Sequence, residues 1–167
     1  HSPNPAFFAV ATGTGISGLR IEDVLIEDCA SVSIKLFGNY NGTTFDSSKI
    51  VKAPILRRVT VRNAGWMGLS AQYVDDGKVT RCVFEQINTK GEFNASPKSG
   101  AIKATKNHRL VIEHSVFSFC GNGHGVWLDQ SNYDCTVASS YFSDIGGSAL
   151  FWEISHRLLA VNNLFVR

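Results

Sequence analysis

The sequence predicts an all-β fold, a right-handed parallel β-helix of about six coils, from two observations. A short pattern recurs at an interval of roughly two dozen residues, and two of the intervals are longer by roughly ten. No stretch of ten or more residues shows the i, i+3, i+4 apolar spacing of a helix. Self-similarity at this period, built from short strands and polar bends, is typical of a solenoid whose coils bury their apolar sides by stacking.

The repeated unit starts with a β-branched or aliphatic residue, continues for three residues and reaches a second apolar residue, often followed by Phe. We expect the first residues of the units to form one inward-facing column. We expect a second buried column four residues beyond the second apolar residue. The first column comprises Ile21, Ile55, Val79, Ile112, Val137 and Ala160, and the second comprises Cys29, Asn63, Ile87, Cys120 and Ile145.

The two long intervals are interpreted as ordinary coils that carry insertions, near residues 38–48 and 88–99. Both segments are rich in Asn, Gly, Ser, Thr and Lys, as loops are. We expect one β-helix domain over residues 1–167, and a piece of a longer β-helix because no obvious cap opens or closes it. A β-sandwich would instead show hairpin turns between alternating strands, for which Asn41-Gly42 is the one candidate.

The composition is that of a globular domain, with 44% hydrophobic and 18% charged residues. A net charge of +2 does not favour nucleic acid or a membrane surface as a partner. No apolar run approaches the ~18 residues of a membrane span. We do not expect the start, His1-Ser2-Pro3, to be a signal peptide. An extracellular or periplasmic location is slightly favoured, and the oligomeric state is left open.

The four cysteines, Cys29, Cys82, Cys120 and Cys135, form no C-x-x-C pair and have no metal-ligand spacing. Cys29 and Cys120 fall in the second column, where a buried thiol behaves as a small hydrophobic residue. We therefore expect unpaired core or turn cysteines, with disulfides as the alternative. Neither a metal site nor a cofactor site is predicted.

Two similar segments carry the candidate chemistry. Each segment ends in a carboxylate, and the two carboxylates are about two dozen residues apart, one of the shorter intervals of the repeat. The segments are Gly123-His124-Gly125-Val126-Trp127-Leu128-Asp129 and Gly147-Ser148-Ala149-Leu150-Phe151-Trp152-Glu153. If that interval makes one coil, Asp129 and Glu153 lie on neighbouring coils. Because side chains alternate along a strand, Asp129 and Trp127 should point outward, together with Glu153 and Phe151.

Two neighbouring carboxyl groups are the catalytic groups of most glycosidases. Adjacent coils lie ~4.7–4.9 Å apart, which matches the ~5–5.5 Å between the carboxyl groups of retaining enzymes. Two like charges this close cannot both ionise freely. One of the two pKa values should therefore rise, so that this group becomes the acid.

The C-terminal half resembles a known family. The run Gly125-Val126-Trp127-Leu128-Asp129, followed by Gly146-Gly147, Glu153-Ile154-Ser155-His156 and Val161-Asn162-Asn163-Leu164-Phe165, looks like the catalytic region of the β-helix glycoside hydrolases of family 120. These are β-xylosidases, and the related family 141 is similar. The likeness covers about residues 100–166 and implies that Asp129 is the nucleophile and Glu153 the general acid/base.

Five further residues are candidates for binding a carbohydrate substrate. Trp127 and Phe151 could stack on a sugar ring or pack under a loop. His156 could hydrogen-bond a hydroxyl or shape a bend, whereas a structural role is preferred for His108. Lys103 could hold the nucleophile ionised or be a solvated lysine. His124 is a loop residue that could line the site.

Two other functions remain open. A polysaccharide lyase or epimerase could use Lys103, Arg109 or Arg157 as a base or charge neutraliser, often with Ca²⁺. The adjacent acids that could hold such an ion lie far from the motif, at Glu22-Asp23, Glu27-Asp28 and Asp75-Asp76. A non-catalytic carbohydrate-binding β-helix would bind sugar through its aromatic residues and be indifferent to loss of the carboxylates.

Overall fold

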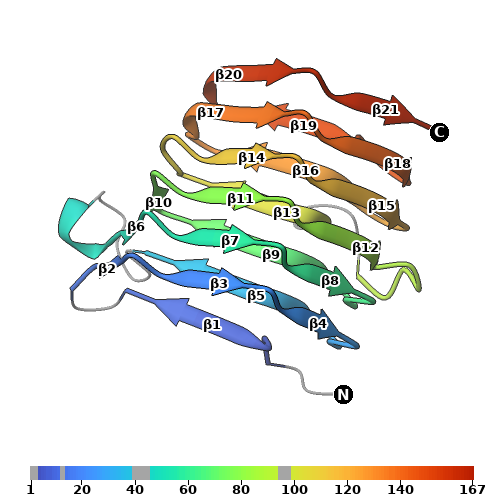
Figure 1. Ribbon diagram of the computed structural model, residues 1–167, viewed down its shortest axis with the longest axis horizontal. Coiled ribbons are helices and arrows are strands. Elements are labelled where there is room, and N and C mark those ends of the chain that lie inside the picture. The colour runs from blue at the N-terminus through green and yellow to red at the C-terminus, as the bar shows by residue number, and fades with distance from the viewer. Residues whose placement is uncertain (1–3, 12–13, 39–45, 94–98) are drawn as a thin grey trace.

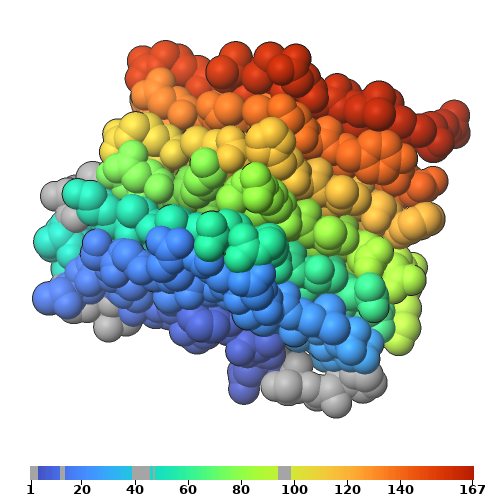
Figure 2. All heavy atoms as spheres, viewed as in Figure 1, coloured from blue at the N-terminus to red at the C-terminus, as the bar shows by residue number. Residues whose placement is uncertain are grey.

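The structure is a computed structural model that describes residues 4–11, 14–38, 46–93 and 99–167. It is a right-handed parallel β-helix in which successive coils stack along one axis (Figure 1). Figure 2 shows the coils as bands that follow one another in sequence order, from blue at the N-terminal end to red at the C-terminal end. The predicted fold class is therefore confirmed.

Each coil contributes one strand to each of three parallel sheets, which have six strands each within the described residues. Sheet 1 consists of β1 (Phe7–Val10), β5 (Val32–Phe37), β9 (Met67–Gln72), β13 (Gly100–Thr105), β16 (His124–Asp129) and β19 (Leu150–Glu153). Sheet 2 consists of β3 (Arg20–Glu22), β7 (Ile55–Arg57), β11 (Lys78–Thr80), β14 (Val111–Glu113), β17 (Tyr133–Ala138) and β20 (His156–Val161). Sheet 3 consists of β4 (Leu25–Glu27), β8 (Thr60–Arg62), β12 (Val83–Ile87), β15 (Val116–Cys120), β18 (Tyr141–Ile145) and β21 (Leu164–Val166).

The lower coils carry a small additional sheet of β2 (Ile16–Ser17), β6 (Val51–Lys52) and β10 (Val74–Asp75). The stretch between β5 and β6 holds a short 3-10 helix, Ser47–Lys49, and the other long connection joins β12 to β13. The two predicted insertions near residues 38–48 and 88–99 fall on these connections. Residues 39–45 and 94–98, with Asn41-Gly42 among them, lie outside the described residues.

The first predicted column is right except at one coil, where the register was wrong by one residue. Leu56, and not Ile55, pairs with Ile21 below and Val79 above. Leu56 is buried, whereas Ile55 is partly exposed. The coils are therefore 35, 23, 33, 25 and 23 residues long, the separations that also recur in the hydrogen bonds between coils. Ala160 closes the column but is exposed, because it lies on the last coil.

The same slip affects the second column. Ala64 takes the position predicted for Asn63. The backbone carbonyl of Ala64 accepts a hydrogen bond from the N–H of Asn88 on the next coil. The carbonyl of Ile87, the next member of the column, accepts from the N–H of Gly121 in the same way. Asn63 has a positive φ and donates its side-chain amide to Asp28 instead. Ile87, Cys120 and Ile145 pair as predicted, with the first two buried and Ile145 partly exposed.

A sharp corner between sheets 2 and 3 explains the repeat. One residue per coil there has φ near +50°, a left-handed conformation that turns the chain within two residues. The corner residues are Asp23, Arg58, Arg81, His114, Ser139 and Asn162. Behind the corner, Phe84, Phe117, Phe142 and Phe165 stack with ring centroids 4.8–5.4 Å apart. These rings are the Phe residues of the sequence pattern. Phe84, Phe117 and Phe142 are buried in the core beneath sheet 3, whereas Phe165, on the last coil, is exposed.

The cysteines are free, as the sequence analysis favoured. Cys82, Cys120 and Cys135 are buried, and Cys29 is partly exposed. Burial raises the pKa of the Cys120 thiol to about 12 and that of Cys135 to about 11. These thiols therefore act as small apolar side chains.

A polar ladder lines the corner between sheets 1 and 2. The Asn107 side-chain carbonyl accepts from the backbone of Val74, and that of Asn132 accepts from the backbone of Asn107. Asn132 in turn donates its backbone N–H to the hydroxyl of Ser155. The Asn132 amide also donates to the carbonyls of Ala104 and Asp129, at 3.1 and 2.8 Å. The ladder thereby fixes the backbone at the end of the strand that carries Asp129.

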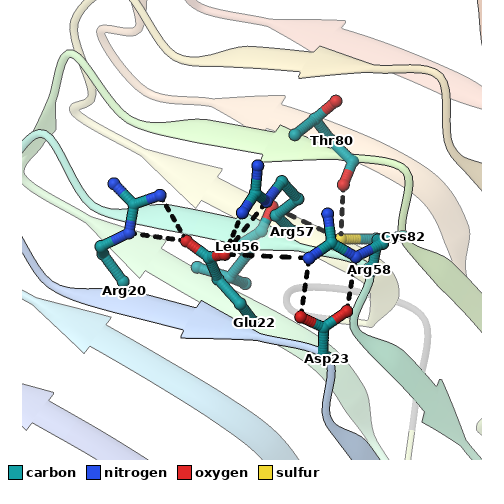
Figure 3. Close-up of polar contacts among 8 residues, drawn as sticks. All are labelled: Arg20, Glu22, Asp23, Leu56, Arg57, Arg58, Thr80 and Cys82. Atoms are coloured by element: carbon teal, nitrogen blue, oxygen red, sulfur yellow. Dashed lines mark hydrogen bonds and ion pairs between the residues drawn. The ribbon is translucent and has the colours of Figure 1, made fainter.

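Ion pairs connect neighbouring coils on the outer face of sheet 2 (Figure 3). Arg57 and Arg20 both bind Glu22, and Arg58 binds Asp23. The hydrogen bond from Arg57 lowers the pKa of Glu22, and the one from Arg58 lowers that of Asp23. Because these groups are solvated, the pairs contribute little to stability individually.

The sequence contains two identical tripeptides, His108-Arg109-Leu110 and His156-Arg157-Leu158. His108 pairs with Tyr133, which pairs with His156 one coil further on. The three rings follow one another with centroids 5.4 and 4.7 Å apart. His108-Arg109-Leu110 and His156-Arg157-Leu158 therefore lie on the same side of the molecule, two coils apart.

Candidate functional site

Strands β16 and β19 of sheet 1 place the two candidate carboxylates next to each other. Asp129 pairs directly with Glu153, and Trp127 pairs with Phe151. The intervening Val126 and Leu128 belong to the core, and Leu150 and Trp152 pack against it. The predicted register and the predicted alternation of inward and outward side chains are therefore both observed.

Asp129 forms a buried ion pair with Lys103 from the preceding coil. Lys103 lies on β13, where it pairs with Trp127, and its Nζ extends to within 2.7 Å of Asp129 Oδ2. Lys103 is 5% exposed and Asp129 is 7% exposed. Lys103 is thus not a solvated lysine. An ion pair at this depth requires close geometry, and removal of one partner leaves an uncompensated charge.

Trp127 contacts both Lys103 and Glu153 and is 5% exposed. The ammonium group of Lys103 is 2.9 Å from the centroid of its ring, a cation–π contact. Its indole Nε1–H donates to Glu153 Oε2 at 3.2 Å. Asp129, Lys103, Trp127 and Glu153 therefore form one continuous set of contacts, which we call the carboxylate bridge.

The rings of His124 and Phe151 pack against each other and against Trp127. His124 is the first residue of β16 and not a loop residue as expected. Its ring centroid lies 4.8 Å from that of Trp127 and 4.8 Å from that of Phe151. Trp127 and Phe151 are 5.2 Å apart. His124 Nδ1 accepts from the backbone N–H of Ser148 at 3.0 Å, which places the proton of the neutral ring on Nε2. Phe151 is only partly buried, so it is the more accessible of the two predicted platforms.

His156 is separated from this cluster. It begins β20 in sheet 2, beyond the corner that follows Glu153, and its exposed ring stacks on Tyr133. His114 occupies a corner position with positive φ, away from this cluster. Among the predicted site residues, the structure brings together Lys103, His124, Trp127, Phe151, Asp129 and Glu153, and places His156 around the corner.

Two contributors to the site were missed in the sequence. Asn132 holds the Asp129 carbonyl, and the Ser148 backbone orients His124. Asn107 and Asn132 occupy equivalent positions, as does Ser155, directly before the residues of the His108–Tyr133–His156 column. Extending the comparison of these tripeptides by one residue gives Asn107 and Ser155, but Asn132 lies before a tyrosine and outside that comparison. The Ser148 contact uses a backbone group, which leaves no residue-type signal.

The two arginines that the sequence suggested as bases, Arg109 and Arg157, are engaged elsewhere. Arg109 binds Asp75 and Asp76, and Arg157 binds Asp134. In the described ranges, no group of three or more His, Cys, Asp or Glu residues could hold a metal ion. No helix in the part of the chain that the structure describes is long and apolar enough to cross a membrane.

His124 gives the site a predictable response to pH. Burial lowers the pKa of His124, with a further decrease from the positive charge of Lys103. The unfolded chain takes up this proton near pH 6.5, whereas the folded chain does so only at lower pH. The unfolded state therefore binds more protons in this window, and stability falls as the pH drops through it.

Substitution of His124 by Phe, which preserves a ring against Trp127 and Phe151, should remove this contribution. Thermal unfolding at pH 7.5 and pH 5.5 measures it. We expect a larger loss of melting temperature on acidification in the wild type than in His124→Phe. Equal losses in the two proteins would contradict the burial of a neutral imidazole at this position.

Comparison with known proteins agrees with the architecture. A crystal structure of a candidate glycosyl hydrolase from Parabacteroides merdae aligns with a TM-score of 0.55 and 10% identity, over 90% of this chain and 82% of that chain. The enzymatically active domain of tailspike protein 2 from bacteriophage CBA120 aligns with a TM-score of 0.49 and 12% identity, over 90% of this chain and 25% of that chain. At so low an identity, the likeness to the bacterial protein supports the fold alone.

A search of curated protein sequences found no match. The sequence profile of the family described as "Right handed beta helix region" matches residues 9–167, nearly the whole chain. This match agrees with the stacked parallel coils and the inward columns of the structure. The chain belongs to the right-handed β-helix family.

Proposed function

We propose that this β-helix is a retaining glycoside hydrolase in which Asp129 is the nucleophile and Glu153 is the general acid/base. The observation that carries the proposal is the direct pairing of these two residues on adjacent coils, with both side chains on the outer face of sheet 1. Neighbouring parallel strands lie ~4.7–4.9 Å apart. This spacing is close to the ~5–5.5 Å between the carboxyl groups of retaining enzymes and shorter than the ~6.5–9.5 Å of inverting ones.

The surroundings of the two carboxylates suit different roles. Asp129 is buried against the Lys103 ammonium group, which compensates its negative charge. Glu153 is more exposed, and its side chain accepts from the neutral indole of Trp127. A nucleophile must be a carboxylate, whereas an acid/base must exchange protons with the leaving group and with water. Two carboxylates in contrasting environments are typical of such a division of labour.

The proposed substrate is a β-xyloside-like oligosaccharide or polysaccharide. The carbohydrate class is supported by the candidate glycosyl hydrolase that shares the fold. The sugar itself depends on the resemblance of residues 100–166 to the β-helix hydrolases of families 120 and 141. Phe151 offers a partly exposed ring for stacking on a sugar, with His124 beside it. His156 would contact only a part of the substrate that extends around the corner toward sheet 2.

Nuclear magnetic resonance of the first-formed anomer tests the reaction directly. Hydrolysis of an aryl β-xyloside should give the β-anomer before mutarotation, because the carboxylate attacks first and water then attacks the glycosyl-enzyme. An initial α-anomer would contradict the nucleophile assignment. An unsaturated, ultraviolet-absorbing product from a uronic-acid polymer would indicate a lyase instead.

Substitution of Glu153 by Ala should separate substrates by leaving group. Turnover of aryl glycosides with acidic phenols should be largely preserved in its first step, because these leaving groups need no proton. Turnover of alkyl glycosides should fall by about 10²–10⁴-fold, the usual contribution of general acid catalysis. Equal losses for both substrate types would contradict the role of Glu153 as the acid.

A further inference from the structure

The position of Trp127 points to a role other than sugar stacking. We propose that Trp127 is a positioning residue, whose indole N–H holds Glu153 beside Asp129, and that its ring is not a binding platform. The inference rests on the proposed function, because it concerns how the acid/base is oriented. It is carried by the 3.2 Å contact between Trp127 Nε1 and Glu153 Oε2 and by the burial of the ring.

The ring of Trp127 is already occupied by protein groups. The Lys103 ammonium group lies 2.9 Å from the ring centroid. His124 packs edge-on at 4.8 Å between centroids, and Phe151 lies at 5.2 Å. A sugar that stacked on this ring would have to displace Lys103 and thereby break its ion pair with Asp129. Removing one partner of a buried ion pair is strongly unfavourable, so the ring remains covered.

The indole N–H has a defined chemical consequence. It is a donor only, so it occupies a lone pair of Glu153 Oε2. Oε1 is then the oxygen that carries the transferable proton. During glycosylation, Asp129 bonds to the anomeric carbon while the bond to the leaving group breaks and the Oε1–H proton passes to the glycosidic oxygen. During deglycosylation, Oε1 takes a proton from the attacking water, which restores the acid and releases Asp129.

The carboxylate bridge also links the nucleophile to the acid/base through direct side-chain contacts. Lys103 contacts Asp129 and the face of Trp127, and the edge of Trp127 contacts Glu153. One buried tryptophan thus fixes both carboxylates relative to each other. A shift of about 1 Å in a reacting group is enough to cost about 10²-fold in rate.

The hydrogen bond is tested without any substrate. The chain has three tryptophans, so a nitrogen–proton correlation spectrum should show three indole signals. Trp127→Phe identifies the Trp127 signal by its loss. We expect Glu153→Ala to move this proton signal upfield and to leave that of Trp66 in place, whereas Trp152 adjoins the substituted residue and is not used for comparison. Glu85→Ala, a substitution on β12 of sheet 3, is the control and should move none of them. A Trp127 signal that does not respond to Glu153→Ala overturns the proposal.

The positioning role is tested by kinetics of Trp127→Phe, which keeps a ring beneath Lys103 and removes the N–H. We expect kcat for alkyl glycosides to fall by about 10²-fold with little change in KM. The first-turnover release of activated aryl leaving groups should change little, because that step needs no proton. Trp66→Phe makes the same chemical change at a tryptophan stacked on Phe93, far along the chain, and should retain wild-type kinetics. A raised KM with unchanged kcat would identify Trp127 as a sugar platform and overturn the proposal.

The catalytic roles of Asp129 and Glu153 and the positioning role of Trp127 are tested by different variants. If Asp129→Ala and Glu153→Ala retain wild-type turnover, the proposed function is wrong, whatever Trp127→Phe does. If those two variants behave as expected but Trp127→Phe slows the first-turnover release of alkyl and aryl leaving groups equally, only the positioning role is overturned. A thermal melt of each variant confirms that the folded protein is being compared.

Discussion

Asp129→Ala is expected to abolish glycoside hydrolysis, with a loss in kcat of about 10⁴-fold or more, which corresponds to at least ~5.5 kcal/mol. The reason is that no glycosyl-enzyme can form without the attacking carboxylate. Glu153 is the neighbouring carboxylate, but its position suits proton transfer to the leaving group. Measurement of kcat with an activated aryl glycoside gives the most sensitive comparison, because that substrate does not depend on protonation.

The loss of activity must be distinguished from a loss of fold. Removal of Asp129 breaks the buried ion pair with Lys103, which costs about 3–5 kcal/mol. Asp129→Asn retains an acceptor for Lys103 and serves as the milder variant. Azide supplies a direct positive test, because it can enter the space vacated in Asp129→Ala and displace the aryl leaving group. The product should be the α-glycosyl azide, of inverted configuration. Full activity without azide, or no azide adduct from a folded variant, would contradict a nucleophilic role.

The fold was predictable because the coils of a solenoid repeat the same pattern of apolar residues at a regular sequence interval. Each coil must present an apolar residue at the same height, so Ile21, Val79 and Ile112 recur at coil-length intervals. The error at Ile55 has a physical cause. Ile55 and Leu56 are both aliphatic, and a shift of one residue exchanges the inward and outward faces of a strand. The corner residue with positive φ, Arg58, decides which of them points inward, and this conformation has no residue-type signature there.

The candidate site was predictable where it depended on register alone. Asp129 and Glu153 are equivalent positions of two similar segments, so their pairing follows from the repeat. The contacts of Lys103 were not predictable in detail. Its strand partner is Trp127, but its long side chain extends to Asp129. The burial of Trp127 likewise depends on Lys103 and His124 lying over and beside its ring, which strand alternation does not describe.

The buried cysteine column gives the strongest test of the packing. Cys120 is 1% exposed and lies between Ile87 and Ile145 on neighbouring coils. Burial already raises the pKa of its thiol to about 12, because a charge at this position is poorly solvated. Cys120→Asp should therefore unfold the domain, since an unpaired charge in the core costs several kcal/mol against a total stability of ~5–15 kcal/mol.

Thermal and denaturant unfolding of Cys120→Asp should show a large loss of stability at pH 7 and a partial recovery near pH 4. The recovery follows because a buried carboxyl group is far less unfavourable when protonated. Cys29→Asp is the matched control, because Cys29 belongs to the same column but is partly exposed on the first coil, where an added charge can reach water. Cys120→Val, which keeps an apolar side chain, should cost less than about 1.5 kcal/mol. If Cys120→Asp melted at the wild-type temperature, Cys120 could not lie in the closed core between coils, and the stacking of sheet 3 would have to be redrawn.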